Sequence, residues 1–329
     1  MTDVSVLNLV PVRAGKNSGD AINDMVALAQ KAEALGYRRY WIAEHHNTAS
    51  LASSATQLLI GHTLAHTQRI RVGSGGVMLP NHSPLMVAEQ YGTLATIYPD
   101  RVDLGLGRAP GTDQMTAAAL RRNERDVSLH FPDDVRQLQR YLGDVREQGY
   151  VCAYPGVGTH VPLYILGSST ESAYLAAELG LPYVFAAHFA PRMLEQALEI
   201  YRRMFKPSPV LDKPKVMVCL NAIVAESDEE AEYLATSQKQ FFLNVVRNAR
   251  QPLQPPVSSM DGIWHESEEA MARQMLSCSL VGSQASVADQ LTRLQTQLRA
   301  DELMVVSYVY DVEKQYESYA LFKEVAEAH

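Results

Sequence analysis

Two adjacent histidines, His45 and His46, follow the apolar run YWIAE and are well suited to acid–base chemistry. An imidazole changes charge near neutral pH, so a single histidine here can act as an acid, a base or a hydrogen-bond donor. Adjacent side chains at a strand end point in different directions, and no HxH or HExxH spacing accompanies this pair. We therefore predict no metal ion at this position. A structural histidine bonded to the backbone is the open alternative.

The segment GSSTES contains Gly167, Ser168, Ser169 and Ser172 and has the composition of an anion-binding helix start. The free N–H groups and the dipole at a helix N-terminus favour a phosphate, and serine hydroxyls add further donors. A serine that merely caps the helix produces the same pattern and is the commoner case. The residues alone leave both interpretations open.

Two pairs of glycines end neighbouring apolar runs. Gly75 and Gly76 would lie beneath a planar ring, and Gly105 and Gly107 would let a flat ligand come close to the backbone. The alternative for Gly75 and Gly76 is that they only relieve crowding where strands converge.

Arg108 follows these glycines in the segment GLGRAPG, which superficially resembles a dinucleotide-binding fingerprint. Pro110 occupies the position of the third glycine, so the fingerprint fails. The Arg108 guanidinium is suited to a phosphate or to a carbonyl on a pyrimidine edge. An ion pair with a nearby carboxylate is the alternative.

These residues must be positioned by a regular succession of strands and helices. Apolar runs with alternating or β-branched residues alternate with segments of helical spacing, about seven or eight times along the chain. Such a succession implies a parallel sheet covered by helices, and eight units close into a (β/α)8 (TIM) barrel. We predict one barrel domain over residues 1–329. In this fold active sites lie where strands end and βα loops begin, which is where all the candidate residues fall.

One segment, residues 248–271, interrupts the succession before the last strands. It is rich in proline and serine and too long for a plain connection, so it is either a lid or a floppy insertion.

Composition narrows the class of protein. The 329 residues are 47% hydrophobic and carry a net charge of -8, without a dense Lys/Arg stripe, which argues against nucleic-acid binding. The three cysteines have no framework spacing, which favours a reducing, cytoplasmic location. Neither a signal peptide nor a membrane span is expected.

Four segments together carry a resemblance to a known family: YWIAEHHN, RIRVGSGGVMLPNHSPLMVAEQYGTL, YPDRVDLGLGRAPG and YILGSSTESAYLAAELGLPYVFAAHF. Over essentially its whole length the chain resembles the bacterial luciferase-like flavin monooxygenases. The resemblance implies a (β/α)8 barrel that binds FMN at the C-terminal ends of its strands.

The resemblance also assigns roles. It implies that the FMN phosphate rests on Ser168, Ser169 and Ser172, and that a cis peptide lies beneath the flavin ring at Gly75–Gly76. His45 corresponds to the catalytic histidine of the luciferase chain. Gly167 opens the phosphate segment, and Arg108 corresponds to an arginine that reaches the ring edge and the phosphate.

The implied activity is oxidation of a small organic substrate by reduced FMN (FMNH2) and O2 through a C4a-peroxyflavin. A separate flavin reductase supplies the reduced cofactor, and the resemblance implies a homodimer formed by helices after the second and third strands. The departures are Ser168, where the luciferase chain has an acidic residue, and Gly107, where it has a cysteine; light emission is not implied. The alternatives are a deazaflavin-dependent oxidoreductase, a non-catalytic flavin-binding protein and, outside the family, a sugar-phosphate or metal-dependent hydrolase on the same barrel.

Overall fold

The chain folds into strands and helices that alternate from end to end. The computed structural model describes residues 2–109, 113–121 and 127–328. The strands are β1 (Asp3–Asn8), β2 (Arg39–Ile42), β3 (Arg71–Met78), β4 (Val102–Gly107), β5 (Leu163–Gly167), β6 (Tyr183–Ala186), β7 (Val216–Ala225), β8 (Ser279–Ser283) and β9 (Glu302–Val306). The helices are α1 (Ser18–Ala34), α2 (Thr56–Ala65), α3 (Pro84–Ile97), α4 (Gln114–Arg121), α5 (Phe131–Leu142), α6 (Thr170–Leu179), α7 (Leu194–Met204), α8 (Asp228–Val246), α9 (Glu266–Met275), α10 (Gln284–Leu298) and α11 (Val312–Glu327).

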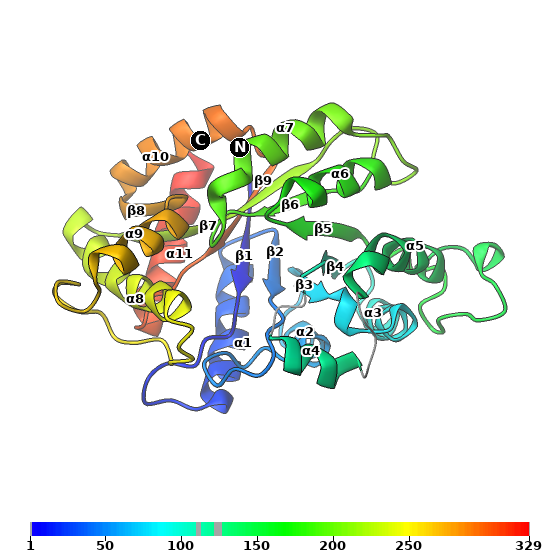
Figure 1. Ribbon diagram of the computed structural model, residues 1–329, viewed down its shortest axis with the longest axis horizontal. Coiled ribbons are helices and arrows are strands. Elements are labelled where there is room, and N and C mark those ends of the chain that lie inside the picture. Colours follow the sequence, from blue (N-terminus) through cyan, green and yellow to red (C-terminus); the bar gives the residue numbers. More distant parts are fainter. Residues whose placement is uncertain (1, 110–112, 122–126, 329) are drawn as a thin grey trace.

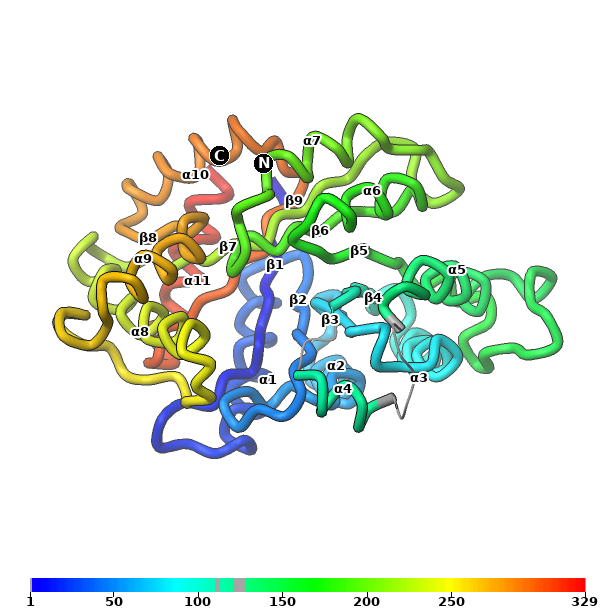
Figure 2. The backbone as a smooth tube through the Cα atoms, viewed as in Figure 1, coloured from blue at the N-terminus to red at the C-terminus, as the bar shows by residue number. Residues whose placement is uncertain are grey.

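Eight parallel strands close into a barrel. The order β6-β5-β4-β3-β2-β1-β9-β7 is closed by pairing between β6 and β7, and β8 extends the sheet outside the barrel along the second half of β7. Helices surround the strands, and the colours of the chain trace succeed one another around them (Figures 1 and 2). The predicted TIM barrel is therefore confirmed.

The helices are held on the barrel by apolar stripes, and several begin with side-chain caps. In α1, Asn17 accepts hydrogen bonds from the N–H groups of Gly19 and Asp20, and the Asp20 side chain bonds back to Asn17 N–H. This reciprocal arrangement satisfies donors that the first helical turn leaves free. Helices α6, α8 and α10 begin with simpler caps, in which the hydroxyl oxygens of Ser169, Ser227 and Ser283 accept a hydrogen bond from a backbone N–H of the first turn.

The N-terminal end of the barrel holds a dense ionic network. Arg39, at the start of β2, donates to the carboxylates of Asp103 and Glu302 at 2.6 Å each and to Tyr164 Oη at 2.9 Å. Arg71 binds the other oxygen of Asp103, and all three interior members, Arg39, Asp103 and Glu302, are fully buried. Burial alone lowers the pKa of Arg39, but the two carboxylates raise it above its ordinary value. The buried charges are thus paired, as a buried site requires.

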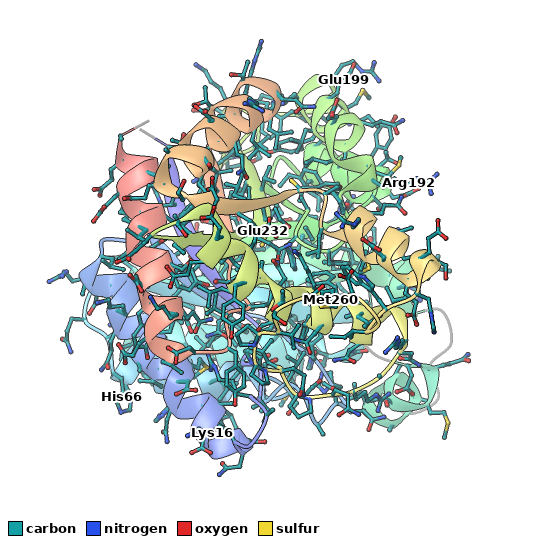
Figure 3. All side chains as sticks on the ribbon, turned by 90° about the vertical axis from the view of Figure 1, so that its left-hand side faces the viewer. Lys16, His66, Arg192, Glu199, Glu232 and Met260 are labelled. Atoms are coloured by element: carbon teal, nitrogen blue, oxygen red, sulfur yellow. The ribbon has the colours of Figure 1, made fainter. Side chains whose placement is uncertain are left out.

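Residues 248–271 are tied to the rest of the molecule. Leu253 is fully buried and exchanges backbone hydrogen bonds with Val12 and Ala14 in the loop after β1. Arg250 hydrogen-bonds the carbonyl of Asn47, and residues from Glu266 onward belong to α9. Figure 3 shows α8 with Glu232 and the following segment with Met260 on the same side of the molecule.

One further difference from the sequence-based expectation is the short strand β8, which was not predicted. Pro110 and Gly111 of GLGRAPG lie outside the described residues. Within the described residues, none of the helices combines the length and apolar character that a membrane crossing needs.

Candidate active site

The ends of four neighbouring strands bring the predicted residues to one rim. Strands β2, β3, β4 and β5 are adjacent in the sheet and parallel, so their C-terminal ends meet. His45 follows β2, Gly75–Gly76 lies within the second half of β3, Arg108 follows β4, and Gly167 ends β5. The rim is the C-terminal face, where barrel enzymes place their catalytic groups.

His45 is a neutral imidazole with an unsatisfied nitrogen. Its backbone N–H donates to the carbonyl of Ser53 at 3.3 Å, but its Nδ1 atom is buried and has no hydrogen-bond partner among the described residues. Burial lowers the pKa of His45 to about 4, and the adjacent Glu44 carboxylate offsets only part of this effect. A histidine that served only as a structural link to the backbone would not leave this nitrogen unpaired.

Glu44 forms a closed hydrogen-bond network beside His45. One carboxylate oxygen accepts from His46 Nε2 and His82 Nε2, each at 2.8 Å, and the other accepts from the Met78 N–H at 3.2 Å. Burial alone raises the pKa of Glu44, but the hydrogen bonds from the two imidazoles lower it to about 2. Since a carboxylate only accepts, both imidazoles carry a hydrogen on Nε2. The network links the ends of β2 and β3 and so fixes the backbone on either side of His45.

The same three groups are of the kind that ligate metals. One ligand atom from each of Glu44, His46 and His82 lies within 4.8 Å of the others. The sequence analysis overlooked this combination because His82 reaches the cluster from the turn after β3 rather than from a local motif. His45 is not a member of the group. The hydrogen bonds just described satisfy all three side chains without an ion.

The peptide between Gly75 and Gly76 is cis, as the family resemblance implies. The pairing of β3 with β4 shifts register between Ser74 and Val77, where this peptide lies. A Cβ atom at Gly75 would stand 2.6 Å from Leu7 Cδ1, and one at Gly76 would stand 2.9 Å from the Gly105 carbonyl oxygen. Packing therefore accounts for both glycines, while Gly75 keeps part of its surface exposed at the rim.

The structure gives a packing reason for Gly105. A Cβ at Gly105 would stand 2.2 Å from the carbonyl oxygen of Ser74 on the neighbouring strand, so the close approach of β3 to β4 requires a glycine here. A Cβ at Gly107 would stand 3.0 Å from Met78 Sδ, an atom of a flexible side chain. The interpretation of these glycines as openings for a flat ligand stays a prediction.

The three serines predicted to bind the phosphate differ in how far their hydroxyls are already hydrogen-bonded at the start of α6. Ser169 is the N-cap, and its hydroxyl accepts from the Ser172 N–H at 3.4 Å. The Ser172 hydroxyl is buried, donates to the Ser169 carbonyl at 2.7 Å and lies 3.0 Å from Tyr183 Oη. Ser168 is half-buried. Of the three hydroxyls, that of Ser172 is already taken up inside the protein.

Gly167 and Arg108 complete this corner of the rim. A Cβ at Gly167 would stand 2.1 Å from Ser172 Oγ, so the glycine makes room for the helix start. Arg108 is exposed, and its charge helps to lower the pKa of Glu171, after hydrogen bonds from the Glu171 backbone and from Ser169. Arg108 thus lies close to the N-terminus of α6.

Two residues that the sequence analysis missed are His188, after β6, and Asn221, in β7. Both are buried, and His188 Nδ1 and Asn221 Oδ1 have no hydrogen-bond partner among the described residues. Burial lowers the pKa of His188 to about 3, and repulsion from His45 acts in the same direction. The sequence does contain a signal for them. Every second residue of a barrel strand faces inward, and this alternation includes Asn221 in β7 and, continued past the end of β6, His188.

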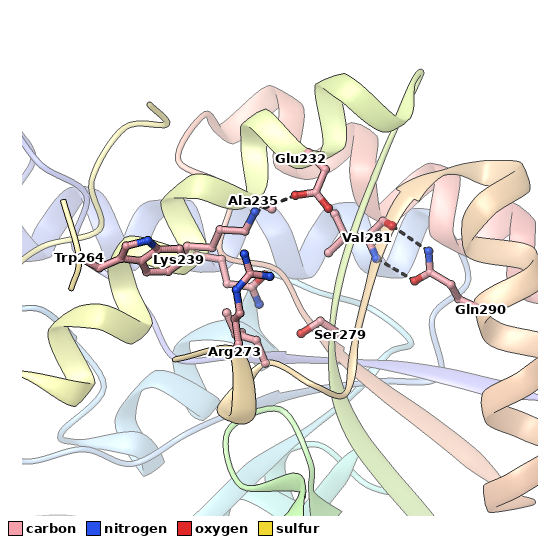
Figure 4. Close-up of a pocket in the computed structure, with 10 residues that line it drawn as sticks. Glu232, Ala235, Lys239, Trp264, Arg273, Ser279, Val281 and Gln290 are labelled. Atoms are coloured by element: carbon pink, nitrogen blue, oxygen red, sulfur yellow. Dashed lines mark hydrogen bonds and ion pairs between the residues drawn. The ribbon is translucent and has the colours of Figure 1, made fainter. Parts of the chain in front are cut away.

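A surface pocket adjoins β7 from outside the barrel, since Ser279, which lines it, accepts a hydrogen bond from Asn221 Nδ2 at 3.3 Å. It is formed between α8, α9, β8 and α10, and Trp264 and Arg273 border it together with Glu232, Lys239, Ser279 and Gln290 (Figure 4). Its charged residues are largely paired, for example Lys239 with Glu232 at 2.7 Å. None of the predicted site residues lines it.

Comparison with known proteins places this geometry in context. A family model described as luciferase-like monooxygenase matches residues 2–301. A luciferase-like monooxygenase of Escherichia coli (strain K12) is 48% identical over 323 residues, which cover 98% of this chain and 96% of that protein. The solved structure of apo-MsnO8 is 34% identical, covers 100% of this chain and 99% of its own, and superposes with a TM-score of 0.93.

More distant structures share the fold alone. The oxygenating constituent of 3,6-diketocamphane monooxygenase from the CAM plasmid of Pseudomonas putida, solved with FMN, is 17% identical, covers 99% of this chain and 98% of its own, and has a TM-score of 0.74. An F420-dependent secondary alcohol dehydrogenase is 16% identical with the same coverage and a TM-score of 0.70. The shared barrel thus serves both flavin and deazaflavin chemistry.

Proposed function

The chain belongs to the luciferase-like monooxygenase family, and on that premise we propose that it is an FMN-dependent monooxygenase that oxidises a small organic substrate with O2. The observation that carries the proposal is the half-buried imidazole of His45, which its lowered pKa keeps neutral and whose buried Nδ1 atom is unpaired among the described residues, on the rim that also holds the cis peptide Gly75–Gly76. Buried polar groups without a partner are rare in folded proteins and indicate a ligand or a catalytic task.

The residues of the rim fit FMN. The exposed part of Gly75 offers a flat backbone surface for the flavin ring, and Arg108, Ser168 and the free N–H groups at the start of α6 suit a phosphate. Gly76, Gly167, Ser169 and Ser172 shape this surface by packing and capping, since the Ser172 hydroxyl is already engaged with Ser169 and Tyr183. Reduced FMN would supply the electrons that activate O2.

The chain's own residues would hold the reactants and control a proton. His45 is kept neutral by burial, so its ring can accept or donate a hydrogen bond without bringing a charge into the site. Glu44, His46 and His82 fix the backbone around His45 and are positioning residues. Exclusion of water from the rim would suppress loss of the reducing equivalents to hydrogen peroxide.

The wider setting of the enzyme is part of the same proposal. A separate flavin reductase would supply reduced FMN. A homodimer through α2 and α3 is supported by the exposed apolar side chains of Leu58, Met86 and Ile97 on these helices. The free cysteines, two of them buried, support a cytoplasmic location, and we propose that residues 1–329 act as one barrel domain.

Anaerobic mixing with reduced cofactor, followed by rapid mixing with O2, tests the proposal. We expect bound reduced FMN to be reoxidised more slowly than free reduced FMN, and His45→Ala to restore fast reoxidation with more hydrogen peroxide. His62→Ala, at an exposed histidine of α2, is the matched control and should behave as the wild type. Reoxidation at the rate of free FMN, or tight binding of reduced F420 in place of FMN, would contradict the proposal.

A further inference from the structure

Three buried polar groups without hydrogen-bond partners converge at the C-terminal mouth of the barrel. They are His45 Nδ1, His188 Nδ1 and Asn221 Oδ1, and each is unpaired among the described residues. His188 is 8% exposed and Asn221 is fully buried. Leaving a buried polar group unpaired is unfavourable, so three such groups in one place indicate a common ligand.

The strand alternation directs these side chains into the barrel. Trp41 on β2, Ala43 directly after it, and Met217 and Cys219 on β7 belong to one buried cluster of interior residues. His45 and Asn221 are the next positions of the same period-two series. They therefore point to the interior side at its open end.

A hydrogen bond joins Asn221 to His188, and an electrostatic interaction joins His188 to His45. The Asn221 Nδ2 group donates to the His188 carbonyl at 2.7 Å and to Ser279 Oγ at 3.3 Å. These bonds fix the amide so that Oδ1 is the free atom, an acceptor that only a donor can satisfy. The rings of His45 and His188 are close enough for a charge on one to disfavour protonation of the other.

The surroundings of this polar group are apolar and aromatic. The interior cluster below it includes Cys219, Phe242 and Tyr308, and Phe241 and Trp264 pack against the same cluster. Phe241 stacks on Tyr308 with ring centroids 4.5 Å apart. Apolar and aromatic surroundings of this kind suit an apolar body whose head group is selected by a few polar atoms.

We propose that His45, His188 and Asn221 form the polar end of the substrate pocket and select an uncharged, mainly apolar substrate that carries an N–H or O–H donor. The inference rests on the proposed function only in calling the bound molecule a substrate. Binding of such a molecule at these three residues does not depend on that function. A carboxylate is disfavoured because Asn221 Oδ1 offers only lone pairs and both imidazoles are held neutral by burial. His45 would serve both the cofactor and the substrate.

The test uses the flavin-free full chain and three small aromatic probes, benzamide, benzoate and toluene, titrated by ligand-observed NMR. Benzamide and benzoate have nearly the same shape and differ in charge and in the N–H donor. We expect benzamide to bind at least about tenfold more tightly than benzoate. Asn221→Leu should weaken benzamide binding by about tenfold and leave toluene unchanged. His188→Phe should act in the same direction and serves if Asn221→Leu does not fold.

The control is Ser237→Ala in α8, which removes another buried polar atom that is unpaired among the described residues but is not one of the three. It should leave all three affinities unchanged. Three outcomes would overturn the inference. The first is that benzoate binds as tightly as benzamide or more tightly, and the second is that benzamide affinity is unchanged in both site variants. The third is that none of the probes binds. Because no flavin is present, the outcome is independent of the oxygen experiment, and either proposal can fail alone.

Discussion

The two ends of the barrel treat buried polar groups in opposite ways. At the N-terminal end, Arg39, Asp103 and Glu302 are fully buried and every charge has a partner within 2.6 Å. At the C-terminal end, the nitrogens of His45 and His188 are buried and unpaired. The charges of the first end are paired within the protein, whereas the second end leaves polar atoms that our proposal assigns to a ligand. On this proposal, stability and binding depend on opposite ends of the same eight strands.

We expect the largest effect from a substitution that disrupts the buried ionic network at the N-terminal end of the barrel. Arg39→Met leaves the buried carboxylates of Asp103 and Glu302 without their shared partner, so we expect the free energy of unfolding to fall by about 3–5 kcal/mol. Urea denaturation followed by circular dichroism measures this loss. The folded fraction should still bind FMN as the wild type does. A loss below about 1 kcal/mol would contradict the structural role of the network.

The second effect is a loss of stability in acid, caused by the two histidines with unpaired nitrogens at the C-terminal end. The pKa values of His45 and His188 in the folded protein are lowered to about 4 and about 3, below the ordinary value of 6.5. Protonation therefore favours the unfolded chain. The stability is unaffected above pH 6.5 and falls as the pH drops below it, by up to about 1.4 kcal/mol per pH unit for each histidine.

Urea denaturation between pH 7 and 4.5 measures this slope, and His188→Phe should flatten it relative to the wild type. The exposed His62 provides the control, because His62→Phe should leave the slope unchanged. An identical slope in wild type and His188→Phe would show that folding does not lower the pKa of His188.

The third effect is a loss of stability when the paired carboxylate of Glu44, at the C-terminal end, is removed. Glu44→Gln replaces an acceptor of three hydrogen bonds with a group that satisfies fewer donors, so we expect a loss of about 1–3 kcal/mol. The folded pKa of Glu44 is about 2, below the ordinary value, so its stabilisation is present above pH 4.5 and is lost as the pH falls toward 2. The variant should therefore differ most from the wild type near neutral pH. A difference that grew in acid would contradict the assignment.

The fold was accessible from sequence because strand alternation and helical spacing recur through the chain, and GSSTES correctly marked a helix start at Ser169. The strand β8 escaped because its five residues pair only with the end of β7, outside the barrel. The network of Glu44 and His82 escaped because its members meet only after β2 and β3 lie side by side. The packing constraint on Gly105 escaped for the same reason, since it comes from a carbonyl of the neighbouring strand.

The smallest effect concerns the exposed cation of the rim. Arg108→Ala should weaken FMN binding by about 1 kcal/mol, because a solvent-exposed charge contributes little to a phosphate site. Fluorescence titration with FMN measures the change, and the thermal unfolding temperature should not move. Arg136→Ala, at an exposed arginine of α5, is the control. A loss of hundredfold or more would mean that Arg108 is drawn into a closed site.

The most direct measurement of the central claim is a crystal structure of the full chain with FMN bound. The account predicts the flavin ring on Gly75–Gly76 within reach of His45, and the phosphate at the start of α6 beside Arg108. A flavin bound between α8, α9 and β8, in the pocket of Figure 4, would contradict it, and so would a ring that leaves His45 without a ligand.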